Sequence, residues 1–221
     1  MAEMSSQHYY LGDACICWSF GKDISRELSY RVHRLYRLLI QDEAFGNLQV
    51  LDLVPSYNAL AIHFDPARLD PGALVDVVDG IIENRLIPTD RESEEPGLEG
   101  KQVVIPVVYD GEDLGRVAEL NGLSVEEVID IHVSGDYTVA MIGFLPHFPY
   151  LIGLDKRLVT PRLDSPRTTI PAGSVSIAAA QAGIYPRQSP GGWNIVGSMD
   201  PELLKPIEPG DKIIFKRVEK L

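Results

Sequence analysis

The residues best suited to chemistry lie in one cationic stretch, residues 143–197. This stretch has five basic and two acidic residues, a net charge of +3, so the rest of the chain must carry −15 for the total to be −12. Three of its arginines, Arg162, Arg167 and Arg187, each follow a proline. Proline stiffens the backbone before the guanidinium, which suits bidentate binding of a carboxylate or phosphate. The alternative for each arginine is an ordinary solvated loop cation.

A glycine-containing turn, Ser-Pro-Gly-Gly-Trp at residues 189–193, lies near the end of this stretch. Because glycine leaves the backbone uncovered, N–H groups here can bind a carboxylate or a developing oxyanion. Gln181 is the one polar residue among neighbouring alanines. A buried amide must find hydrogen-bond partners, so Gln181 is a candidate for binding a substrate amide. His132 shares the apolar side of an expected helix, which favours a hydrogen-bonded core histidine over a catalytic base.

General catalytic motifs are missing from the sequence. It has no GxxxxGK[ST] phosphate loop, no GxGxxG, no HExxH, no CxxC and no GxSxG. Cys15 and Cys17 fall on the same face of an expected strand, so we expect free core thiols without a disulfide. We therefore expect no metal site, and no ATP site in this chain alone.

Composition excludes several classes of protein. The net charge of −12 would repel the phosphate backbone, so nucleic acid is not an expected partner. No apolar run reaches the ~18 residues that a membrane span needs. The N-terminus has no basic start followed by an apolar stretch and a cleavage site, so the expected location is the cytoplasm.

The first 88 residues predict an α+β domain of ferredoxin-like order. Residues 10–20 alternate as a strand does, and a helix with Asp23 or Ser25 as its N-cap follows. Two strands, 48–54 and 59–64, are joined by a hairpin turn, and Asp70-Pro71 opens a second helix. This β-α-β-β-α order needs one more strand to complete a ferredoxin-like unit.

Residues 89–101 predict an acidic linker, and residues 102–221 a mainly-β barrel domain. The barrel domain begins with a strand at 103–109 and helices at 112–120 and 124–133, the second with a capping box. Beyond it, 10 of the chain's 16 prolines lie between residues 141 and 210, which nearly excludes helices. Short strands separated by Pro and Gly indicate a sandwich or small barrel, closed by a last strand at 212–218.

Residues 143–197, with PAGSVSIA followed by GIYP and SPGGW, resemble the signature of the family of 5-oxoprolinase B subunits. This family is also called the KipI or allophanate hydrolase subunit 1 family. Residues 112–132 and 54–66 fit the same family. The resemblance implies a ferredoxin-like N-terminal domain followed by a cyclophilin-like β-barrel. This agrees with the α+β pattern of the first 88 residues and the mainly-β pattern of residues 102–221.

The resemblance also implies a function. Family members act with a C subunit, which resembles allophanate hydrolase subunit 2, and with an A subunit to open 5-oxoproline to glutamate at the expense of ATP. ATP is then used by the complex, and this chain is inactive alone and contributes part of a composite site with the C subunit. The implied catalytic residues are Arg162, Arg167, Gln181 and His132. The implied substrate-binding residues are Tyr150, Tyr185, Ser189, Gly191, Gly192 and Trp193.

Other functions remain open. The aromatic residues Tyr150, Tyr185 and Trp193 could instead be core residues with one polar tip. The chain could belong to an allophanate- or urea-type amide hydrolase, or be a KipI-like inhibitor of a sensor histidine kinase. Prolyl isomerisation rests on the fold alone. The chain departs from the family pattern at His147, Leu163 and Ala182 and in a shortened loop after Gly197, which bears on the substrate.

Overall fold

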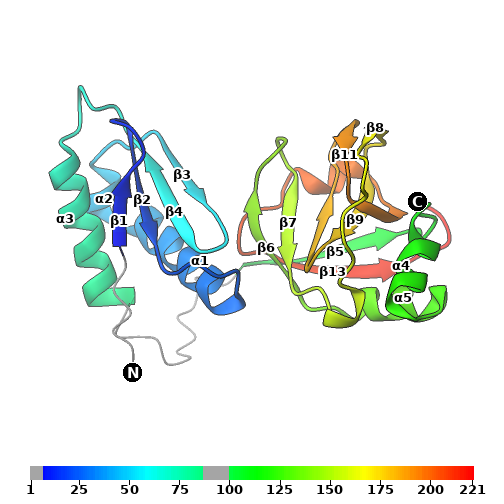
Figure 1. The fold of residues 1–221 in the computed structure, drawn as a ribbon. Coiled ribbons are helices and arrows are strands. Elements are labelled where there is room, and N and C mark those ends of the chain that lie inside the picture. The colour runs from blue at the N-terminus through cyan, green and yellow to red at the C-terminus, as the bar shows by residue number, and fades with distance from the viewer. Residues whose placement is uncertain (1–6, 87–99) are drawn as a thin grey trace. The chain divides into compact units, whose positions relative to one another are not determined.

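A computed structural model of the chain describes residues 7–86 and 100–221. The chain forms two compact units, Met1–Glu99 and Gly100–Leu221 (Figure 1). The linker expected at residues 89–101 lies outside the described residues except for Gly100 and Lys101. In the described ranges, no helix is both long and apolar enough to cross a membrane.

The first unit has an antiparallel sheet with helices on one face (Figure 1). In chain order its elements are β1 (Gln7–Tyr10), β2 (Cys15–Ser19), α1 (Arg26–Gln41), α2 (Glu43–Gly46), β3 (Asp52–Pro55), β4 (Ala59–His63), α3 (Pro71–Ile81) and the π-helix η1 (Ile82–Leu86). Ser25 caps α1 by accepting from the N–H of Leu28, and Asp70 caps α3 with Pro71 in its first turn. The apolar faces of α1 and α3 pack with β2 and β4 in one core, as the periodicity predicts.

The strand expected at residues 10–20 is shorter and forms β2, and an additional strand, β1, precedes it and pairs with it as a hairpin. Gly12 lies between them with φ +70, a left-handed conformation that interrupts the alternating pattern. The sheet order is β1-β2-β4-β3. The further strand that a ferredoxin-like unit needs is therefore β1, at the edge beside β2, and it precedes the rest of the unit in sequence.

The second unit is built mainly of short strands. Its elements are β5 (Gln102–Val107), α4 (Leu114–Asn121), α5 (Val125–Val133), β6 (Tyr137–Ile142), β7 (Pro149–Ile152), η3 (Lys156–Leu158), β8 (Arg167–Ile170), β9 (Ser174–Ala178), β10 (Gln181–Ile184), β11 (Ser189–Gly191), β12 (Asn194–Ser198), η4 (Pro201–Leu204) and β13 (Lys212–Arg217). The capping box of Ser124 and Glu127 opens α5, as predicted. After residue 141 the only helices are the short 3₁₀ turns η3 and η4, consistent with the proline content.

Seven of these strands form a mixed, nearly closed barrel in the order β12-β9-β10-β7-β6-β13-β5. Only the β13–β5 pair is parallel. Val108 and Ser198 close the gap between β5 and β12, because each N–H donates to the other's carbonyl, at 3.0 and 2.8 Å. A Cβ on Gly197 would lie 2.6 Å from the carbonyl oxygen of Val108, so this closure requires glycine. The predicted order of an α+β region followed by a barrel is confirmed.

A separate two-stranded ribbon of β8 and β11 stands beside the barrel. Helix α4 packs on β12, and α5 packs on β13. Buried residues of β5, β6, β9 and β13 form one core with the inner faces of both helices. A smaller apolar cluster around Phe148 and Trp193 lies between this core and the ribbon's strands.

We predict that residues 100–221 fold alone, because this unit has its own core and its barrel closes on itself. The fragment should show cooperative urea unfolding and dispersed amide resonances. Gly197→Val in the same fragment should abolish both, since the new side chain meets the Val108 carbonyl. An unfolded parent fragment would show that the barrel depends on the first unit.

Candidate functional site

One pocket of about 290 Å³ lies in the second unit, within the cationic stretch. Its walls come from the β6–β7 loop, β7, the segment before β8, and the region from the end of β10 to Trp193. The lining contains five aromatic residues, one cation and no acid. The lining residues are Phe144, Phe148, Tyr150, Arg162, Pro166, Tyr185, Pro190, Gly191, Gly192 and Trp193.

The floor of the pocket is a set of aromatic rings in edge-to-face contact around Phe148. The ring of Phe148 is 5.1 Å from that of Tyr185 and 5.9 Å from that of Trp193, measured between centroids. Gly183 in β10 lies beneath them, where a Cβ would come within 2.9 Å of both Phe148 and Trp193. The missing side chain at Gly183 therefore allows these rings to meet. Such edge-to-face packing makes a rigid apolar surface for a planar ligand.

Arg162 is the cation of the pocket, and its backbone is held on both sides. The carbonyl of Pro161 accepts from Nδ2 of Asn194 at 2.9 Å, and the N–H of Leu163 donates to the carbonyl of Gly192 at 2.8 Å. The exposed guanidinium lies 5.8 Å from the centroid of the Trp193 ring, within cation–π range. No carboxylate of the described residues forms an ion pair with it. Its charge is thus directed at the pocket.

Two tyrosines add polar groups to the apolar walls. Burial raises the pKa of Tyr185, although the backbone N–H of Trp193 and the nearby arginines oppose this. Burial also raises the pKa of Tyr150, against the charge of Arg162. Both phenols are therefore neutral at physiological pH and can donate a hydrogen bond. A Cβ on Gly191 would lie 2.2 Å from Oη of Tyr185, so only glycine at this position leaves room for the hydroxyl beside the turn.

The structure brings six of the ten predicted site residues to the pocket lining: Tyr150, Arg162, Tyr185, Gly191, Gly192 and Trp193. Ser189 is buried next to them in β11, and its Oγ has no hydrogen-bond partner. Gln181 begins β10 and is not part of the lining. The expectation that Gln181 is a buried amide is wrong, because it is partly exposed and its neighbours Ala179 and Ala180 are exposed.

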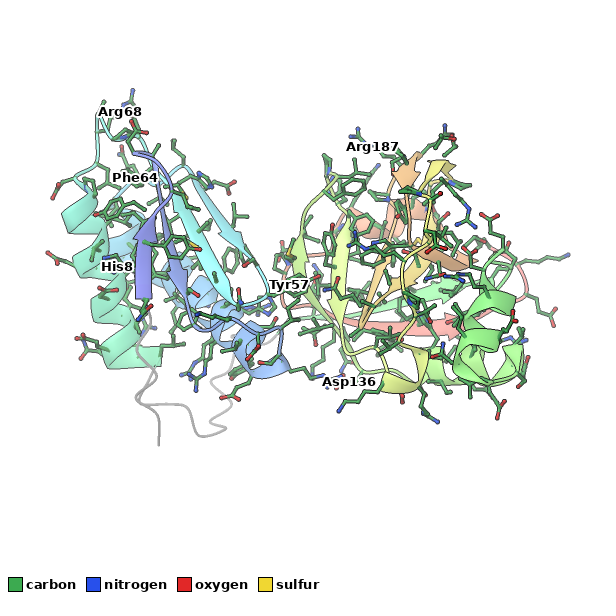
Figure 2. The ribbon with its side chains drawn as sticks, in the orientation of Figure 1. His8, Tyr57, Phe64, Arg68, Asp136 and Arg187 are labelled. Carbon is green, nitrogen blue, oxygen red and sulfur yellow. The ribbon has the colours of Figure 1, made fainter. Side chains whose placement is uncertain are left out.

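Arg167 is not part of the pocket lining and is held in ion pairs, so we correct its expected role as a free anion-binding group. Nη1 and Nη2 form a bidentate pair with Asp113 at 2.9 and 2.8 Å, and Nε lies 2.9 Å from Oε1 of Glu112. Two carboxylates balance the charge of this guanidinium and engage all three of its nitrogens, so it is poorly placed to bind a further anion. Arg187, the third arginine that follows a proline, lies exposed on the β10–β11 loop at the ribbon end of the unit (Figure 2).

His132 lies in the barrel core and not in the pocket, which corrects its place among the catalytic candidates. Its ring packs 4.7 Å from Phe215 and 5.3 Å from Tyr137, between centroids. Nδ1 lies 2.8 Å from Oη of Tyr109, and Nε2 is buried without a hydrogen-bond partner. Burial lowers the pKa of His132 to about 3, so the ring is neutral. The core interpretation of this histidine agrees with its surroundings.

Several lining residues were not predicted from the sequence, namely Phe144, Phe148, Pro166 and Pro190. Phe144 and His147 have left-handed backbones, with φ of +65 and +67. Glycine adopts this conformation at little cost, which explains why the family pattern has glycine where this chain has His147. The sequence feature that could have indicated Phe148 is the group of aromatic residues before β7. Hydrophobic periodicity alone predicts that such residues belong to the core.

No group of three or more His, Cys, Asp or Glu residues that could hold a metal ion occurs in the described parts of the chain. Cys15 and Cys17 are buried free thiols in the first unit. Burial raises the pKa of Cys15, whose Sγ lies 3.8 Å from Nε2 of His63. A buried thiol of raised pKa is a poor nucleophile, so the pocket remains the candidate site.

Residues 7–211 match the carboxyltransferase domain family, subdomains C and D. The chain belongs to this family. It is 36% identical to the 5-oxoprolinase B subunit of Bacillus subtilis (strain 168), an alignment that covers 95% of this chain and 92% of that protein. It is 32% identical to the 5-oxoprolinase B subunit of Escherichia coli O157:H7, over 94% of each chain. The resemblance to the family of 5-oxoprolinase B subunits is thus confirmed.

The solved structure of TTHA0988 is similar in fold, with a TM-score of 0.78 and 36% identity. The similar region covers 94% of this chain and 40% of that chain. The present chain therefore spans less than half the length of this solved relative, and its two units correspond to part of a longer polypeptide there.

The buried His132 predicts a dependence of stability on pH. The unfolded histidine has a pKa of 6.5 and the folded one about 3, so acid favours the unfolded state. The contribution of the neutral ring to the free energy of unfolding is fully present above pH 6.5. It is lost as the pH falls toward 3, at about 1.4 kcal/mol per pH unit. His132→Gln should therefore lose less stability between pH 7 and pH 5 than the parent does.

The measurement is urea unfolding at both pH values in a Trp18→Phe background, where Trp193 is the one tryptophan left of two and reports the second unit. His147→Gln, an exposed histidine of the same unit, is the control and should behave as the parent. Equal losses in the parent and His132→Gln would contradict the assignment of a neutral buried ring.

Proposed function

We propose that this chain is the B subunit of an ATP-dependent 5-oxoprolinase, and that its pocket binds 5-oxoproline in a composite site with the C subunit. Support comes from similarity to 5-oxoprolinase B subunits over almost the whole chain. The observation that carries the proposal is the placement of one cation, Arg162, over the Trp193 ring in a pocket lined by aromatic residues and no acid.

The pocket matches the chemistry of 5-oxoproline, a five-membered lactam with one carboxylate. Its flat ring would lie against the rings of Phe148 and Trp193, and its carboxylate would face Arg162. The amide would meet the phenol of Tyr150 or Tyr185, or the backbone at Gly191. The volume of about 290 Å³ is at the small end of ligand pockets, which suits a small acid.

Opening of the lactam with ATP would begin with transfer of the γ-phosphoryl group to the amide oxygen. Water then attacks the activated carbon and the C–N bond breaks as the nitrogen takes up a proton, which leaves γ-glutamyl phosphate. A second water hydrolyses this acyl phosphate to glutamate and phosphate. Each stage places negative charge on oxygen, which a fixed guanidinium stabilises. In this scheme Arg162 binds the substrate and stabilises charge, and the aromatic walls hold the lactam ring in place for attack by water.

The other polypeptides of the complex would supply the nucleotide site. A nucleoside triphosphate needs several cations or N–H groups around its phosphates, and the pocket lining has one cation. We therefore assign ATP binding to the C and A subunits, and we propose that the complex works in the cytoplasm, where ATP is available. Arg167 acts as a structural ion pair in this proposal, and Gln181 and His132 have no catalytic role.

The first test concerns ATP. We predict that the isolated chain neither binds ATP tightly nor hydrolyses 5-oxoproline, because it lacks a phosphate cradle. Isothermal calorimetry with ATP and magnesium should give no heat of binding at micromolar protein. A micromolar dissociation constant for the chain alone would place the nucleotide site here and contradict this division of roles.

The second test concerns Arg162 in a complex reconstituted with the A and C subunits. Arg162→Ala should lower the rate of 5-oxoproline-dependent ADP release about 10²-fold while the complex still assembles. Arg162→Lys should restore only part of this rate, because lysine keeps the charge but lacks the paired N–H donors of the guanidinium. Arg157→Ala is the matched control: Arg157 pairs with Asp155 and is not in the lining.

Normal turnover by an assembled Arg162→Ala complex would overturn the proposed role of this residue. ATP hydrolysis stimulated by urea or allophanate, and not by 5-oxoproline, would assign the pocket to another amide. Absence of any amide-dependent hydrolysis in the assembled parent complex would contradict the proposed function itself.

A further inference from the structure

We propose that Asp113 is a positioning residue of the pocket, a buried carboxylate that holds the turn at residues 191–193 from both ends. Its effect on turnover rests on the proposed function, whereas its effect on the geometry of Trp193 does not. Asp113 was not among the residues that the sequence singled out. It stands before α4, a helix that contributes nothing to the pocket lining.

The carboxylate of Asp113 binds β12 directly. Oδ2 accepts from the N–H of Ile195 at 2.7 Å, and the N–H of Asp113 donates to the carbonyl of Ile195 at 3.0 Å. Ile195 follows Trp193 by two residues, so this double contact fixes the chain just after the indole. The side chain of Asp113 is 7% exposed, and the low local dielectric strengthens these hydrogen bonds.

The same carboxylate holds the ribbon of β8 and β11 through Arg167. The two guanidinium nitrogens pair with both oxygens of Asp113, at 2.8 and 2.9 Å. In the ribbon, Arg167 lies directly opposite Gly191. The ribbon is not part of the seven-stranded sheet, so this ion pair is one of its attachments to the barrel. Asp113 thus fixes the chain just before the indole as well.

The position of Asp113 in the chain supports a dedicated role. It occupies the N-cap of α4, where an aspartate ordinarily accepts a backbone N–H of the first turn. Its side chain makes no such capping bond. Ser124 and Asp70 do cap their helices through the side chain. The carboxylate of Asp113 is therefore used for Ile195 and Arg167 at the expense of its own helix.

The expected consequence is a pocket that loses its shape when the ion pair is weakened. Asp113→Asn keeps the size and an acceptor for Ile195, but loses the charge that holds Arg167. The ribbon and the turn should then move relative to β12, and Trp193 should no longer lie firmly under Arg162. In the complex, KM for 5-oxoproline should rise about tenfold with a smaller change in kcat, because substrate positioning suffers more than the chemistry.

The test that does not need activity uses full-length chain in the Trp18→Phe background, so that Trp193 is the remaining tryptophan of two. Acrylamide quenching of Trp193 should increase about twofold in Asp113→Asn and in Arg167→Met, and no further in the double variant, since both changes break one unit. Arg167→Lys, a milder change, should give a smaller increase. Asp155→Asn is the matched control, because it breaks another Asp–Arg pair, with Arg157, away from the lining.

Two results would overturn the inference. One is quenching of Trp193 in Asp113→Asn that equals the parent. If that variant does not fold, the decisive result is parental quenching in folded Arg167→Lys. The other requires an active parent complex: KM and kcat for 5-oxoproline in the assembled Asp113→Asn complex that equal those of the parent. If Asp113→Asn does not fold, the same comparison is made with the Arg167→Lys complex. A parent complex without activity, combined with altered quenching, would refute the proposed function and leave the positioning role standing.

Discussion

Closure of the barrel by the paired backbone hydrogen bonds of Val108 and Ser198 is the constraint on which the second unit depends. It fixes β12 between β9 on one side and the end of β5 on the other. Gly197 makes the approach possible, and Gly111 does the same nearby, since its Cβ would lie 2.3 Å from the carbonyl of Ile195. With β12 fixed, the residues at its start become a rigid base for the pocket, because a strand paired on both edges has little freedom left.

Asn194, the first residue of β12, extends this rigidity to the loop that carries Arg162. The side chain is fully buried and its amide is satisfied: Nδ2 donates to the carbonyls of Pro161 and Ile177, and Oδ1 accepts from Nε of Arg116. One amide thus joins β9, β12, α4 and the Arg162 loop. The sequence predicts a buried amide at Gln181, whereas in the structure Gln181 is partly exposed and the buried, hydrogen-bonded amide is that of Asn194. Both are single polar residues beside apolar ones, and only the strand pairing decides which amide meets partners.

Local signals predicted much of the fold. The caps at Ser25 and Asp70 and the capping box at Ser124 were visible because each depends on residues within one helical turn. The proline content of the last third correctly excluded helices there. The extra strand β1 was missed, and β2 was predicted to begin too early, because the turn at Gly12 is marked by only one glycine. Barrel closure was not predictable in detail, since it joins residues 108 and 198 and sequence periodicity contains no information about such distant pairing.

The same distinction between local and distant information explains the outcome at the candidate site. The excess of positive charge in residues 143–197 was evident from composition, but which arginines keep that charge depends on acids elsewhere in the chain. Arg167 is neutralised by Asp113, 54 residues away, and Arg157 by Asp155 in its own turn. Carboxylates thereby remove two competing cations and leave Arg162 over Trp193 facing the pocket. In a protein of net charge −12, the charge that faces this pocket thus depends on which cations pair with carboxylates, and not only on the number of cations in the stretch.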